Sequence, residues 1–158
     1  GREQGYAAAL AAAGVPFDPR LVTYQGSSPA AGYTGAKALM ALAQPPTALF
    51  CFNDRAAMGA YDALRELGLR VPQDVAVVGF DNQELIAANL HPGLTTLQLP
   101  HYEMGAWAVD YLLQTAGGSS PAASAPPQVK LPCPLVLRKS HGLLREEVLE
   151  DRNKPPLF

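Results

Sequence analysis

The sequence predicts an α/β fold in which a parallel sheet is flanked by helices. Residues 75–80 are almost uniformly apolar, which is typical of a strand buried on both faces of such a sheet. Residues 47–52 have a similar composition. Segments with helical periodicity alternate with these strands across short turns, and this order favours parallel pairing through right-handed crossovers.

The first expected element is a helix at the start of the chain. Tyr6, Leu10 and Ala13 recur at helical spacing, and Gly14 follows as a C-terminal stop. A βα unit has a strand before its helix, yet none precedes this one, and the chain opens on Gly1 rather than on methionine. We therefore expect a fragment that begins inside a domain.

Two further strand–helix units are expected to follow. Residues 21–24 are a short strand candidate, and Ser28 with Pro29 supplies the cap and the first turn of a second helix. After the strand at 47–52, Asp54 is expected to cap a third helix, because apolar residues then repeat at helical spacing.

The second half of the chain differs in character. Residues 117–127 (GGSSPAASAPP) are compositionally biased and are interpreted as a flexible surface loop. The other expected elements are a short helix at 84–89, a strand or extended crossover at 94–99, an amphipathic helix at 101–115, apolar strands at 129–131 and 135–137, and a frayed tail at 145–158.

Composition and net charge argue against several classes of protein. With 158 residues, 48% apolar and 16% charged, the chain is about one soluble domain's worth of sequence, and a formal net charge of −2 argues against a module that grips phosphate backbones. No stretch approaches the roughly 18 consecutive apolar residues of a membrane span. Cys51 and Cys133 are interpreted as a buried hydrophobe and an incidental thiol, so we expect a cytosolic protein without disulfide or metal site.

Polar pairs stand at the ends of the two central strands. Asp81-Asn82 follows one strand and Asn53-Asp54 follows the other. In open α/β sheets ligands bind beyond the carboxyl ends of the strands, so these side chains are candidates for a binding wall. The alternative for Asp81 is capping of the next helix, and for Asn53 it is a structural turn amide; capping explains Asp54 better than ligand contact does.

Several motifs, in order and at characteristic spacing, carry a family resemblance. They are REQGY at residues 2–6, PTALFCFNDRAAMGAYDALRELGLRVPQDVAVVGFDN at 46–82, LHPGLTTLQLP at 90–100, EMG at 103–105 and LPCPLVLRKS at 131–140. This series resembles the effector-binding core of the lac and galactose repressor (LacI/GalR) family of transcriptional regulators. The similarity spans nearly the whole chain to about residue 140.

The resemblance implies a periplasmic-binding-protein-like class I domain, present mostly as the C-terminal lobe of a two-lobed sensor. The lobe is expected at 1–99 without its first strand, a helix returning to the N-terminal lobe at 100–117, a flexible loop at 118–127, closing strands at 128–140 and a tail at 141–158. A small sugar-like effector would bind between the lobes and control operator DNA binding by an absent helix-turn-helix headpiece.

The resemblance also assigns ligand-binding residues. Arg2, Asn53 and Asp81 match ligand-contacting positions of the family; a guanidinium, an amide and a carboxylate suit a hydroxyl-rich ligand. Leu99 stands where the family often has a glutamine, and Ser27 where an aromatic platform is common.

A third departure is Asn82, which replaces a second aspartate of the family. These departures put a standard hexose ligand in doubt. His101 and Tyr102 are candidates to line the cleft instead, with packing at a helix start as the alternative.

Met58 matches a subunit-interface position of the family, and Met58 and Tyr61 are expected to lie off the core face of their helix. With Ala57 they are assigned to the interface of a homodimer in the intact protein.

The main alternative to a transcriptional regulator is a periplasmic or transport-associated solute-binding protein, although residues 70–74 look more like the repressor branch. An enzyme with acid–base partners such as Asp81 and His101 is a third option. It is not favoured, because the motifs of nucleotide-dependent and nucleophilic enzymes are missing; no cofactor is expected.

Overall fold

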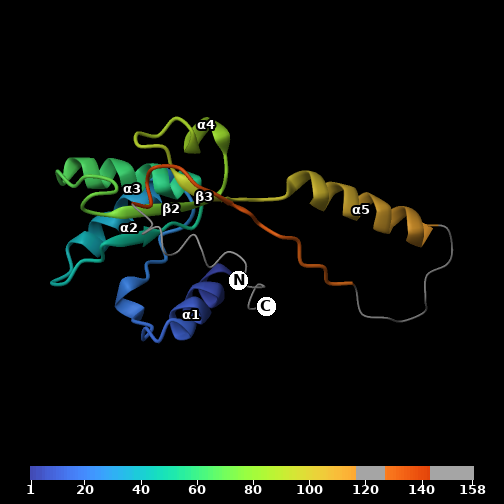
Figure 1. Cartoon of the computed structure of the whole chain (residues 1–158), viewed down its shortest axis with the longest axis horizontal. Helices are drawn as coiled ribbons and strands as arrows, with labels where there is room; N and C mark the ends of the chain where they lie inside the picture. The colour runs from blue at the N-terminus through green and yellow to red at the C-terminus, as the bar shows by residue number, and fades with distance from the viewer. Residues whose placement is uncertain (117–126, 143–158) are drawn as a thin grey trace.

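The computed structural model describes residues 1–116 and 127–142. Four strands form one sheet in the order β1-β2-β3-β4 (Figure 1). The strands are β1 (Ala48–Phe50), β2 (Ala76–Asp81), β3 (Thr95–Gln98) and β4 (Leu135–Val136). The first three pair in parallel and β4 pairs antiparallel to β3, so the predicted α/β fold with a mainly parallel sheet is confirmed.

Helices precede β1 and connect each strand to the next. They are α1 (Arg2–Ala12), a 3-10 turn (Pro19–Leu21), α2 (Pro29–Met40), α3 (Asp54–Glu66), α4 (Glu84–Ala87) and α5 (His101–Ala116). The expected start of α2 is confirmed: the Ser28 hydroxyl accepts a hydrogen bond from the Ala31 amide at 3.2 Å, and Pro29 occupies the first helical position.

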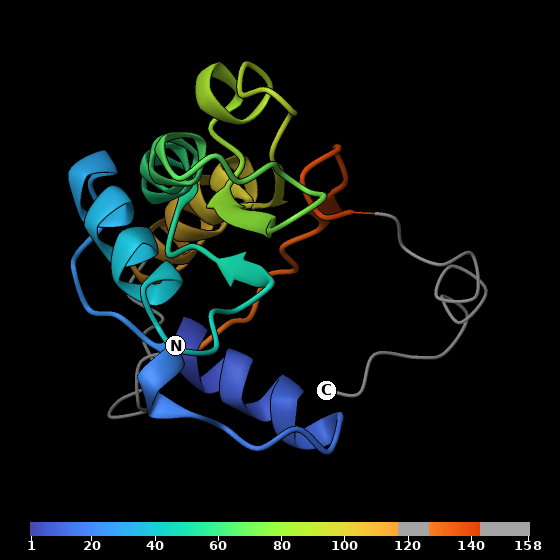
Figure 2. The same cartoon turned by 90° about the vertical axis from the view of Figure 1, so that its left-hand side faces the viewer.

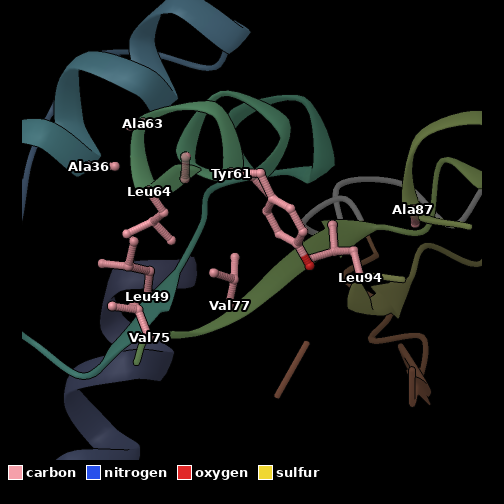
Figure 3. Packing of buried hydrophobic residues seen from close by; sticks show 11 residues of the cluster. Ala36, Leu49, Tyr61, Ala63, Leu64, Val75, Val77, Ala87 and Leu94 are labelled. Carbon is pink, nitrogen blue, oxygen red and sulfur yellow. The ribbon is translucent and has the colours of Figure 1, made fainter. Parts of the chain in front are cut away.

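The core lies between the sheet and α3 (Figure 3). Leu49 of β1 and Val77 of β2 face the helix residues Tyr61 and Leu64, and Val77 and Leu64 are fully buried. Helix α3 packs in turn on α2, and Gly59 lets the two backbones approach closely. A Cβ on Gly59 would lie 1.8 Å from the carbonyl oxygen of Pro29, so only glycine fits at this crossing.

The opposite face of the sheet is less covered, and the expectation of strands buried on both faces is wrong here. Alternate residues of β2 are buried and half-buried, and Phe50 of β1 is 45% exposed. Figures 1 and 2 show α1 on this side of β1 and β2, across the sheet from α2 and α3. Helix α1 buries none of its residues, so it shields this face only in part.

Helix α5 stands apart from the sheet. Figure 1 shows it projecting beyond β3, with residues 127–134 running back beside the connection. Its residues 101–114 are all exposed, including Met104 and Tyr111 of the expected apolar side. None of the described helices is both long and apolar enough to cross a membrane.

Some expected elements differ. Residues 22–24 are not a strand, because no described segment pairs with them although Val22 is extended (φ −118°, ψ 132°). Residues 129–131 also lack a partner strand, whereas residues 135–136 form β4. Most of the expected loop at 118–127 and most of the tail at 141–158 lie outside the described residues.

Candidate functional site

The turn after β2 has an unusual backbone. Asp81 has a φ of 107° and Asn82 a φ of 50°, both in the region that non-glycine residues rarely adopt. Such residues cost about 1–3 kcal/mol each and persist only where their surroundings hold them. The turn lies at the carboxyl end of a parallel strand, where α/β proteins bind their ligands.

Arg2 lies against this turn. Its Nη2 is 3.3 Å from Oδ1 of Asp81, and its guanidinium carbon lies 4.4 Å and 4.1 Å from the ring centres of Phe52 and Phe80. The planar cation therefore lies over two aromatic rings, which attract it electrostatically. The Nε of Arg2 is buried without a hydrogen-bond partner among the described residues. The structure thus brings together Arg2 and Asp81, two of the predicted ligand residues.

Asn53, rather than Asp54, is the N-cap of α3, so the capping role predicted for Asp54 is wrong. The Oδ1 of Asn53 accepts a hydrogen bond from the Ala56 amide at 2.8 Å. Asn53 is buried at the end of β1, and among the described residues its Nδ2 has no hydrogen bond in the structure. The oxygen of the Asn53 side chain therefore caps the helix, and its nitrogen can still donate a hydrogen bond.

Asp54 lies fully buried beneath the turn. Its Oδ1 accepts a hydrogen bond from the Thr96 hydroxyl at 2.6 Å, and its Oδ2 accepts one from the backbone amide of Gln83 at 2.6 Å. Burial raises the pKa of Asp54 above its ordinary value, while these two hydrogen bonds act in the opposite direction. Gly79 of β2 makes room for the carboxylate, since a Cβ there would lie 2.3 Å from Oδ1.

Asn82 is held from two sides. Its Oδ1 accepts from Nη2 of Arg138 at 2.9 Å, and its Nδ2 donates to Oε1 of Gln98 at 2.5 Å. Arg138 follows β4, and its Nη1 donates to the carbonyl oxygen of Leu94 at 2.8 Å. The turn that carries Asp81 is thereby tied to β3 and to the segment after β4.

An open hollow of about 560 Å³ adjoins the end of β3. It is lined by residues 98–103 together with Pro132 and Pro134, and these include three predicted ligand residues, Leu99, His101 and Tyr102. The Leu99 amide points to the carbonyl oxygen of Asp81 at 3.5 Å. His101 and Tyr102 are exposed, with Tyr102 at 84%, so the described residues do not pack around them at the helix start.

Other predicted residues lie elsewhere. Ser27 is exposed before α2 and has no contact in the structure with the Arg2–Asp81 pair. Ala57 and Tyr61 belong to the core, at 0% and 7% exposure, and the Tyr61 hydroxyl donates to the Pro92 carbonyl at 2.9 Å. Their assignment to a dimer surface is wrong because both face the sheet. Met58 alone of the three is half-buried and keeps the interface assignment as a prediction.

Sequence reasoning missed the residues that support the site. The guanidinium of Arg2 lies over the rings of Phe52 and Phe80, while Gln98 and Arg138 hold the turn. Phe80 immediately precedes Asp81, so its place in the sequence could have indicated that it lies near the site. The role of Arg138 could not be found from spacing, because it lies 56 residues from Asn82 along the chain.

Comparison with known proteins identifies the family of this fold. A family model described as a periplasmic binding protein-like domain matches residues 1–141. The ribose operon repressor of Haemophilus influenzae is 40% identical over 113 residues, which cover 72% of this chain and 34% of that protein. The repressor CytR of Escherichia coli is 36% identical over 139 residues, covering 88% of this chain and 40% of CytR.

A solved structure of the transcriptional regulator CelR in complex with cellobiose is similar, with a TM-score of 0.80, 33% identity, and coverage of 88% of this chain and 41% of that one. The chain therefore spans less than half the length of these curated relatives. The resemblance to LacI/GalR regulators is confirmed. This chain belongs to the periplasmic binding protein-like domain family.

Proposed function

We propose that the chain is the effector-sensing part of a LacI-type transcriptional regulator and that Asp81 and Arg2 bind its small polar effector. The observation that carries this proposal is the Arg2–Asp81 pair at the carboxyl end of β2, with the Arg2 guanidinium over the rings of Phe52 and Phe80. A donor and an acceptor held rigidly side by side at this edge of a sheet suit a ligand with neighbouring hydroxyl groups.

The hydrogen-bonding capacity of the site supports a polar ligand. Asp81 receives one hydrogen bond from Arg2 and another from Nε2 of Gln83 at 3.2 Å, and a carboxylate can accept about four. The Nδ2 of Asn53 provides a further donor. A sugar or nucleoside hydroxyl pair would satisfy these groups, and Phe52, at 52% exposure, offers an apolar face beside them.

Regulation would follow from closure around the effector. A second lobe would complete the site, α5 would return to that lobe, and the closed arrangement would change how two headpieces meet operator DNA. The relatives that carry the name repressor support this part, as does their greater length. The intact protein would act without catalysis, in the cytoplasm, as a homodimer whose interface includes Met58.

Calorimetric titration of the intact protein tests the proposal. D-ribose and cellobiose serve as probes, because one similar protein is a ribose operon repressor and another was solved with cellobiose. Adenosine is the third probe, because it joins a pair of ribose hydroxyl groups to an aromatic base that suits the exposed face of Phe52. Asp81→Asn should weaken binding of the active probe about 10- to 150-fold, since hydrogen bonds to a charged group contribute about 1.5–3 kcal/mol.

Asp74→Asn is the matched control, because it makes the same chemical change at an exposed carboxylate that contacts Arg70. It should leave the affinity unchanged. Binding that is equally strong in wild type and Asp81→Asn would contradict the assigned site. Failure of all three probes would contradict the proposed ligand classes.

A further inference from the structure

We propose that Asn82 and Arg138 are positioning residues that hold the Asp81 carboxylate in its binding orientation; the proposal rests on the ligand role of Asp81 proposed above. Neither residue contacts Arg2 in the structure, and both act through the backbone of the turn. They would set the affinity of the site although they lie 56 residues apart along the chain.

The guanidinium of Arg138 forms hydrogen bonds to residues that flank two neighbouring strands, β2 and β3. Nη1 donates to the Leu94 carbonyl just before β3, and Nη2 donates to Oδ1 of Asn82 just after β2. Its backbone amide also donates to the Thr95 hydroxyl at 2.9 Å, which fixes the base of the side chain. Such a two-pronged arrangement needs the planar fork of arginine, because a lysine ammonium cannot reproduce both directions.

The side-chain amide of Asn82 forms hydrogen bonds through both its oxygen and its nitrogen. While Oδ1 accepts from Arg138, Nδ2 donates to Gln98, and Gln98 is the register partner of Asp81 in the sheet. The side chain therefore bridges the segment after β4 and the end of β3. An aspartate could accept from the guanidinium but could not donate to the Gln98 carbonyl oxygen.

The turn needs these contacts because two successive residues have positive φ. On the inner side, the Gln83 amide is held by Asp54 at 2.6 Å. On the outer side, the Asn82 side chain supplies the restraint. Without it the backbone can relax toward ordinary φ values, which would carry the Asp81 carboxylate away from Arg2.

Hydrogen exchange of the intact, ligand-free protein tests the restraint directly. Asn82→Gly keeps a residue that tolerates positive φ but removes the bridge, and Arg138→Met removes the fork while keeping an apolar stem. Each should speed exchange of the Gln83 amide about tenfold, the effect of losing a hydrogen bond near the turn. The double variant should be no faster than either single variant, because both break the same network.

The Cys51 amide, which donates to the Val78 carbonyl at 2.8 Å between β1 and β2, is the internal reference and should be unaffected. Asn82→Asp is the conservative variant; it keeps the acceptor for Arg138 but loses the donor to Gln98, so its exchange should lie between those of wild type and Asn82→Gly. Unchanged exchange at Gln83 in both single variants would overturn the proposal. So would equal acceleration at Cys51, because it would show general loosening of the lobe.

Titration with whichever of D-ribose, cellobiose and adenosine binds the wild type gives the functional readout. The Asn82→Gly and Arg138→Met proteins should bind that probe about tenfold more weakly, and Asn82→Asp should lie between wild type and Asn82→Gly. Local loosening at Gln83 with unchanged affinity would overturn the positioning role. If no probe binds the wild type, the proposed ligand classes fail, while the exchange data still decide whether the network holds the turn.

Discussion

Gly79→Ala is expected to damage both stability and the ligand turn, because Gly79 leaves the space that the buried Asp54 carboxylate occupies. The new Cβ would lie 2.3 Å from Oδ1 of Asp54 and 2.8 Å from Cδ2 of Leu94, both well inside contact distance. The strand backbone cannot move away freely, since Gly79 pairs with Thr96 in the sheet. Asp54 must therefore shift.

The magnitude follows from two costs. Overpacking a core by one methyl group costs about 1–3 kcal/mol. A displaced Asp54 leaves the buried Thr96 hydroxyl or the Gln83 amide without its partner, at about 1–3 kcal/mol more. The lower backbone entropy of alanine in the unfolded chain offsets about 0.5–1 kcal/mol. The net loss should be about 3 kcal/mol.

Urea unfolding of the intact protein measures this loss in the transition that includes the lobe. Gly5→Ala in α1 is the matched control, because a Cβ there meets nothing within 4 Å and helical alanine is favoured over glycine. That variant should be neutral or slightly stabilised. A loss below about 1 kcal/mol for Gly79→Ala would refute the close packing of Asp54 against β2.

Three further outcomes follow from the packing and the charges. Leu64→Ala, at a fully buried position, should lower the free energy of unfolding by about 2–5 kcal/mol in a urea titration. Gly59→Ala should cost at least about 1–3 kcal/mol in the same assay, because its Cβ meets the Pro29 backbone and pushes α2 from α3. Burial raises the pKa of Asp54 above its ordinary 3.8, so the folded state keeps a proton that the unfolded state loses. The contribution of Asp54 to the free energy of unfolding should therefore decline as pH rises from 3.8 through the higher folded pKa. Carboxylates with a lowered pKa, such as Asp74, act in the opposite direction, so the decline is measured as the difference between wild type and Asp54→Asn in unfolding curves recorded at successive pH values.

The order of elements was predictable because local signals agreed. Ser28 and Pro29 start α2 as expected, and the apolar runs at 47–52 and 75–80 contain β1 and β2. Residues 22–24 could not be judged from their own composition, since a strand exists only where a neighbour pairs with it. Burial on both faces failed for a related reason: an apolar strand shows what it could bury, while the elements packed on it decide what it does bury.

The sequence predicted the polar residues at the centre of the site, but not the residues that hold them in place. The crevice rule placed Asp81 at the carboxyl edge of the sheet, and the structure brings Arg2 to it. The exchange of roles between Asn53 and Asp54 depended on where α3 begins, and sequence patterns locate helix ends only to within a few residues. Tyr61 was misplaced although helical spacing puts it on the buried face, four residues after Ala57 and three before Leu64. Its polar hydroxyl made burial unexpected, and the buried partner of that hydroxyl, the Pro92 carbonyl, cannot be read from the sequence.

A crystal structure of the intact protein with the probe that binds it tests the central claim most directly. The account predicts ligand hydroxyl groups within about 2.7–3.2 Å of the Asp81 carboxylate and of the Arg2 guanidinium, with Phe52 beside the ligand. The turn at Asp81 and Asn82 should keep its positive φ values and its contact with Arg138. A ligand bound elsewhere, with Asp81 contacting only Arg2 and Gln83 as it does now, would contradict the account.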